Sequence, residues 1–132
     1  MQRLKTRPQF QAVLAGRLVS KSKYFALHRL DLDVPHGVSG AGLFSVRGVW
    51  TGAMVPKRWA KRAVTRNAIK RQIYCACANL GDVPLNVAFL VRLKHEFSRK
   101  DFVSASSDAL KTAVRAELQT LMQDYLVRAQ QP

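Results

Sequence analysis

The stretch 85–93 constrains the fold of this chain more than any other part of the sequence. Its residues, LNVAFLVRL, are nearly all apolar, and Arg92 is the one charge among them. A strand without apolar–polar alternation is typical of the inside of a sheet that other elements cover. The sequence therefore predicts a central strand here, with helices packed on at least one face of its sheet.

The first half of the chain contains one predicted helix and two predicted strands. Thr6 followed by Gln9 predicts a capping box at the start of a short helix, and Gly16 predicts the end of that helix. Apolar and aromatic residues at 24–32 and at 49–55 predict two strands.

The second half adds two helices around the central strand. Residues 63 to about 80 form the predicted central helix, and Ser106 or Ser107 is expected to cap a final helix. The order is α-β-β-α-β-α in a chain of 132 residues, so we expect one domain, residues 1–132. The final helix carries an apolar stripe of Leu110, Val114, Leu118, Leu121 and Tyr125.

The charge of the chain limits the kinds of partner that it can bind. There are 22 Lys and Arg residues against 8 Asp and Glu, a formal net charge of +14. A compact domain with that charge repels itself unless a polyanion neutralises it, so nucleic acid, an anionic membrane and an acidic protein are the candidates. No acidic residue occurs between Asp33 and Asp82, which predicts one cationic face.

Other features of the sequence argue against a membrane as the partner and against a metal site in the protein. No apolar run approaches the roughly 18 residues of a spanning helix, and residues 1–8 lack the apolar part of a secretion signal. Cys75 and Cys77 point in different directions on a helix, so we expect free thiols in a reducing compartment, the cytoplasm. The three histidines are scattered, and no metal site is expected.

The central helix concentrates the cations. Arg62, Arg66 and Lys70 are spaced i, i+4, i+8, where like charges destabilise an isolated helix by about 0.2–0.5 kcal/mol per pair. Cations near a helix N-terminus also oppose its dipole, and a phosphate chain there would reverse both effects. The bland alternative is a solvated basic helix face. The residues predicted to contact a nucleic-acid backbone, which the resemblance given next implies to be RNA, are Lys57, Arg58, Lys61, Arg62, Arg66, Asn67, Lys70, Arg71 and Tyr74.

In this segment the chain resembles the protein subunit of bacterial ribonuclease P. The motif is Arg-Asn-Ala-Ile-Lys-Arg at 66–71, preceded by Pro-Lys-Arg at 56–58, and a short helix bearing Phe10 lies near the N-terminus. The resemblance extends over nearly the whole chain in its order of elements. It implies an α+β fold, a single-domain α/β sandwich like the second domain of a small-subunit ribosomal protein, with a left-handed βαβ crossover.

The resemblance also implies a function. RNA would be the catalyst, with Mg²⁺ held by RNA and substrate, and the protein would carry no catalytic or metal-binding residues. Its partners would be the catalytic RNA and the 5′ leader of precursor transfer RNA, with neither membrane nor DNA expected. Arg66→Ala and Lys70→Ala would then weaken RNA binding with little loss of stability.

By the same resemblance, aromatic and neighbouring residues would line or support a cleft for the leader, since bases stack on aromatic rings above a positive groove. Core packing is the alternative for the phenylalanines, and an incidental place on the sheet is the alternative for the histidine. Trp59 departs from the family pattern and could stack on a base or cover the core. The leader-cleft residues are Phe10, Leu14, Phe25 and His28.

Three other functions remain open at this point. A ribosome-associated RNA-binding protein would share the charge and the fold. A DNA-binding protein would use the central helix as its reader and would need a dimer seam, which the sequence does not suggest. A self-contained nuclease would need a third acid or base beside Asp31 and Asp33.

Overall fold

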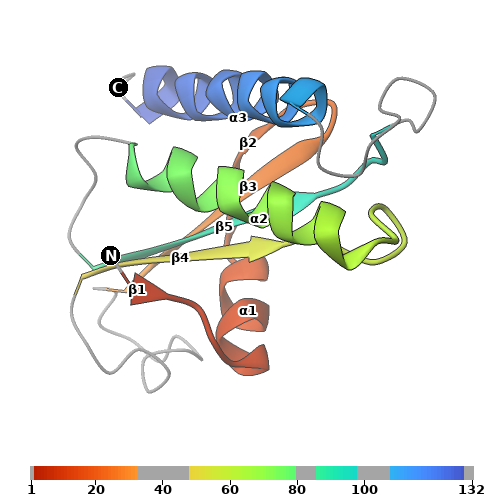
Figure 1. Ribbon diagram of the computed structural model, residues 1–132. Coiled ribbons are helices and arrows are strands. Elements are labelled where there is room, and N and C mark those ends of the chain that lie inside the picture. Colours follow the sequence, from red (N-terminus) through yellow and green to blue (C-terminus); the bar gives the residue numbers. More distant parts are fainter. Residues whose placement is uncertain (1, 33–47, 80–85, 98–107, 130–132) are drawn as a thin grey trace.

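The computed structural model describes residues 2–32, 48–79, 86–97 and 108–129, and in these it has a five-stranded sheet with helices on both faces (Figure 1). The predicted α+β class is confirmed. The caps expected at Ser106 or Ser107, and the last residue of the predicted central helix, lie outside the described residues. In chain order the elements are β1 (Gln2–Arg3), α1 (Arg7–Leu14), β2 (Arg17–Lys21), β3 (Phe25–Asp31), β4 (Val49–Met54), α2 (Ala63–Ala78), β5 (Val87–Leu93) and α3 (Asp108–Ala129).

The predicted central strand is β5, in the middle of the order β1-β4-β5-β3-β2. It pairs parallel with β4 and antiparallel with β3, and all its residues except Arg92 are buried. Strand β4, helix α2 and strand β5 form a crossover between neighbouring parallel strands. The left-handed sense of that crossover stays a prediction from the resemblance.

The sheet separates two cores of unequal size. Helices α2 and α3 cover one face and α1 lies on the other, as Figure 1 shows. Because successive strand residues point to opposite faces, Phe89 and Val91 join the larger core under α2 and α3, while Ala88 and Leu90 join the smaller core under α1. The apolar stripe predicted for the final helix is confirmed, since all five of its residues are buried in the larger core.

Helix α1 begins with the predicted capping box. The Gln9 backbone N–H donates to Thr6 Oγ1 at 3.3 Å, and Gln9 Oε1 accepts from the backbone N–H groups of Thr6 and Lys5 at 3.1 and 2.7 Å. These bonds satisfy donors that a helix start otherwise leaves open.

Gly16 follows α1 as predicted, but for a different physical reason. Its φ is not positive, so it does not form a left-handed helix cap. A Cβ atom on Gly16 would instead lie 2.5 Å from the carbonyl oxygen of Arg29 in β3. The glycine is therefore required by the close approach of the end of α1 to the sheet.

Two edge strands were missing from the predicted order. Strand β1 spans only two residues and pairs parallel with β4 at Trp50 and Thr51. Strand β2 is mostly exposed and has an irregular register between Leu18 and Ser20. Edge strands of this kind carry neither a long apolar run nor a regular alternation, so periodicity does not reveal them.

Candidate nucleic-acid interface

The turn after β4 and the solvent side of α2 carry the cations predicted to bind RNA. Two backbone hydrogen bonds close the turn, from the N–H groups of Trp59 and Ala60 to the carbonyl of Pro56, at 3.0 and 3.1 Å. The opposite side of α2 packs Ile69, Ile73 and Cys77 into the larger core. We call this surface the basic face: exposed Lys57, Arg58, Lys61, Arg62, Asn67 and Arg71, and half-buried Arg66, Lys70 and Tyr74.

The start of α2 carries an unbalanced positive charge. Arg62 is the N-cap residue, its side chain makes no capping hydrogen bond, and no acid lies in the first turn. In the parts of the chain that the structure describes, the ion pairs all lie elsewhere, on Asp31 and Asp124. A helix N-terminus favours anions, and the cations around this one have no carboxylate partner among the described residues. The arrangement suits a polyanion.

Arg66 has a structural role that the sequence did not suggest. Its Nη1 donates to the carbonyl oxygens of Ala60 and Lys61, at 3.0 and 2.9 Å. The guanidinium therefore links α2 to the turn that precedes it. The expectation that Arg66→Ala costs little stability is corrected, because the variant removes two hydrogen bonds from a charged donor.

We expect Arg66→Ala to lower the free energy of unfolding by about 1–2 kcal/mol, the order of two such hydrogen bonds at a partly exposed site. Urea unfolding followed by circular dichroism measures the change. Lys70→Ala is the control, because the described residues give its ammonium group no hydrogen-bond or ion-pair partner. Equal unfolding midpoints for the two variants would contradict the bracing role of Arg66.

Tyr74 receives a contact from the N-terminal strand. The guanidinium carbon of Arg3 lies 4.1 Å from the centre of the Tyr74 ring, a cation–π arrangement. Arg3 is exposed and thereby joins the edge of the basic face. Sequence reasoning missed this residue, because only the parallel pairing of β1 with β4 brings it to α2.

Trp59 lies between a cation and an imidazole. The Arg58 guanidinium carbon is 5.1 Å from its ring centre, and the His95 ring is nearly parallel to it, with centroids 6.3 Å apart. Trp59 is partly buried and packs on the larger core. Covering the core, one of the two alternatives considered for this residue, is what the structure shows.

Three of the four predicted leader-cleft residues share one side of the sheet. Phe10 and Leu14 of α1 are half-buried against the smaller core, and His28 lies on the same sheet face, beside Leu90 of β5. Phe25 is fully buried in the larger core, on the opposite face of the sheet. Its expected place at a cleft is therefore corrected to core packing. Strand 25–31 has apolar residues on both faces, so alternation alone could not assign them to layers.

The α1 side also holds buried polar atoms that find no partner among the described residues. These atoms are both ring nitrogens of His28 and the Nε of Arg92. Burial, and next the positive charge of Arg92, lower the pKa of His28, so its imidazole is neutral at neutral pH. Arg92 was not predicted as a site residue, although it is the lone charge in the apolar stretch 85–93 and that anomaly could have identified it. We call Phe10, Leu14, His28 and Arg92 the α1 surface.

Several predicted alternatives concern chemistry rather than binding. Asp31 forms an ion pair with Arg29 at 2.8 Å, and Asp33 lies outside the described residues.

Cys75 and Cys77 are free thiols as expected, and burial raises the pKa of Cys77 to about 12. In the described residues no three His, Cys, Asp or Glu side chains gather where they could hold a metal, and no described helix is long and apolar enough to cross a membrane.

Fold and surface together define a class: a small α+β protein whose central crossover helix presents a one-signed cationic face. Known proteins are similar to this chain. A family model described as Ribonuclease P matches residues 1–117. The ribonuclease P protein component of Ralstonia pickettii (strain 12J) is 33% identical over 126 residues, which cover 92% of this chain and 76% of that protein. The chain belongs to the ribonuclease P protein family.

Solved structures agree with this assignment at the level of the fold. The ribonuclease P protein of Staphylococcus aureus aligns with a TM-score of 0.63 and 17% identity, covering 93% of this chain and 94% of that chain. The protein from Thermotoga maritima aligns with a TM-score of 0.60 and 19% identity, covering 93% and 96%. Family membership makes the chain a component of the ribonucleoprotein ribonuclease P, which acts in transfer RNA processing.

Proposed function

We propose that this chain is the non-catalytic subunit that lets ribonuclease P RNA bind and cleave precursor transfer RNA at its 5′ end. The observation that carries the proposal is the basic face: cations gathered around an N-terminus of α2 that has neither a side-chain cap nor an acid in its first turn. Phosphates bound there would remove the repulsion between neighbouring cations and satisfy the helix dipole together. We assign the catalytic RNA to this face.

The 5′ leader of the substrate is assigned to the α1 surface. Phe10 and Leu14 are half-buried and offer partial apolar faces, while Arg92 supplies positive charge beside the neutral imidazole of His28. Aromatic surface next to a cation binds single strands with little sequence preference. His28 is buried beneath this surface, so its role is to support the surface and not to contact the leader directly.

Chemistry is assigned to the RNA. Mg²⁺ would be held by RNA and substrate phosphates, since the described residues offer no donor set for it. The work of the protein is to reduce repulsion between two RNA molecules and to position the leader. We also expect the chain to act in the cytoplasm, with neither a membrane nor DNA as a partner.

Cleavage of a precursor transfer RNA by bacterial ribonuclease P RNA at low Mg²⁺, with and without the protein, tests this proposal. We expect stimulation that is lost in Lys70→Ala combined with Arg71→Ala, because each lost phosphate contact weakens RNA binding. The same protein without the RNA should not cleave. Absence of stimulation while RNA binding persists would favour the alternative, a ribosome-associated RNA-binding protein, and co-purification with ribosomal particles would then be the next measurement.

A further inference from the structure

A second cationic site lies away from the basic face, where β2 meets the end of α3. It is a pocket of about 260 Å³ lined by Arg17, Leu18, Val19, Arg29, Tyr125 and Arg128. Helix α2 packs on β4, whereas α3 packs on β2 and β3, so the pocket is at the other edge of the sheet. Figure 1 also shows the turn before α2 and the C-terminal end of α3 at opposite ends of the helical layer.

The three arginines of the pocket are held in different ways. Arg29 is largely buried and immobilised: its Nη1 donates to the Tyr125 hydroxyl at 2.7 Å and its Nε donates to Asp31 Oδ1 at 2.8 Å. The side chains of Arg17 and Arg128 are 69% and 61% exposed, and each has one described carboxylate, Asp31 Oδ2 at 3.6 Å and Asp124 Oδ2 at 3.2 Å. Both therefore keep N–H donors for another partner.

The charges at the site are not balanced. Arg17 and Arg29 are direct cross-strand partners, an arrangement in which like charges repel. Asp31 offsets part of this repulsion and Asp124 is shared between Arg128 and the Ser20 hydroxyl, which donates to it at 2.9 Å. Three guanidinium groups thus face two carboxylates, an excess of one positive charge. The C-terminus of α3 acts as a negative charge of about half a unit, which is smaller than the excess positive charge of the site.

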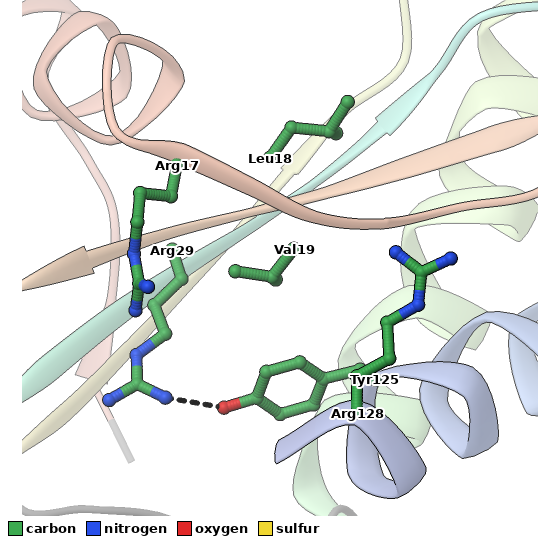
Figure 2. A pocket seen from close by; sticks show the side chains of 6 residues that line it. All are labelled: Arg17, Leu18, Val19, Arg29, Tyr125 and Arg128. Atoms are coloured by element: carbon green, nitrogen blue, oxygen red, sulfur yellow. Dashed lines mark hydrogen bonds between the residues drawn. The ribbon is translucent and has the colours of Figure 1, made fainter. Parts of the chain in front are cut away.

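The donors line the pocket from two sides. Figure 2 shows the guanidinium groups of Arg17 and Arg29 on one side, with the Tyr125 hydroxyl next to Arg29, and the guanidinium group of Arg128 on the other side, across the Tyr125 ring. The Tyr125 oxygen accepts from Arg29, so its own proton remains available to a further acceptor. A tetrahedral oxyanion uses several donors at once, and arginine forks match phosphate geometry.

We propose that this pocket binds a phosphate group, and that the phosphate belongs to the backbone of an RNA held at the edge of the sheet opposite β1. The RNA part of the inference rests on the proposed function, whereas the phosphate part does not. An RNA bound at both sites would contact the protein on two sides. Free phosphate is the other source of the same chemistry.

The first experiment requires no RNA. Inorganic phosphate is titrated into the protein while the arginine Nε–H resonances are followed by heteronuclear NMR. We expect saturable shifts at Arg17 and Arg128 and none at Arg115, which is also exposed on α3 but lies outside the pocket. Unchanged resonances at Arg17 and Arg128 would overturn the phosphate site, whatever the outcome of the cleavage assay.

The second experiment identifies the source of the phosphate. Binding of ribonuclease P RNA and of precursor transfer RNA is measured against salt for Arg17→Gln, Arg128→Gln and the matched control Arg115→Gln. For either RNA we expect the slope of log affinity against log salt to flatten by about one unit in each pocket variant, beyond the change in the control. Slopes equal to that of the control with both RNAs would overturn the RNA assignment and leave a site for free phosphate.

Discussion

A triple variant of the basic face, Arg62→Gln with Lys70→Gln and Arg71→Gln, should bind ribonuclease P RNA roughly a hundredfold more weakly than the natural chain at near-physiological salt. Each lost contact from a charged donor is worth on the order of 1 kcal/mol, and three such contacts give about two decades in Kd. The salt slope should flatten by about three units. Filter binding across a salt series measures both quantities.

The same variant should fold at least as well as the natural chain. Its replacements remove like-charge pairs at i, i+4 and cations near a helix N-terminus, each worth a few tenths of a kcal/mol. The charge-matched control is Lys21→Gln with Lys23→Gln and Arg115→Gln, which are exposed residues outside the basic face. If the control lost as much affinity as the basic-face variant, binding would depend on net charge and not on this surface.

Gly16→Ala should lower the free energy of unfolding by about 3 kcal/mol, or roughly 10 °C in Tm for a domain of this size. The added Cβ would lie 2.5 Å from the Arg29 carbonyl oxygen, an atom of the sheet backbone that cannot move aside alone. The end of α1 would have to separate from β3. Thermal unfolding by calorimetry is the direct measurement.

Gly52→Ala is the comparison for Gly16. Its Cβ would lie 2.5 Å from Leu4 Cδ1 and 3.1 Å from Phe10 Cε1, both atoms of side chains that can turn away. We expect a smaller loss, about 1 kcal/mol. A loss for Gly52→Ala that equals or exceeds the loss for Gly16→Ala would contradict the distinction between backbone and side-chain obstruction.

The elements that sequence reasoning located are those with a strong local signal. The apolar stretch 85–93, the capping box at Thr6 and the apolar stripe of α3 each depend on neighbouring residues alone. The cationic side of α2 follows in the same way from helical spacing. These signals were sufficient to predict the α+β class and the basic face, which is one of the two surfaces proposed to bind RNA.

The features that it missed depend on tertiary contacts. Phe25 lies in the larger core because α2 and α3 cover the sheet face to which it points. Both faces of its strand carry apolar residues, so the strand sequence alone does not reveal that face. Arg3 reaches Tyr74 only through strand pairing. Arg66 bonds to the turn before α2, and the spacing of charges along the helix does not reveal the shape of that turn. The pocket at Arg17, Arg29 and Arg128 unites residues from two strands and from the last helix, more than a hundred positions apart at its extremes.

The position of β5 has a consequence for the synthesis of this protein. Before β5 emerges from the ribosome, β3 can pair only with β2 and β4 only with β1, since β5 is the neighbour that joins them. Isolated two-stranded pieces are at best marginally stable in water. The nascent chain therefore cannot hold α2 in its final place until β5 has been made. Selective RNA binding by the basic face should thus be acquired only after β5 has emerged from the ribosome.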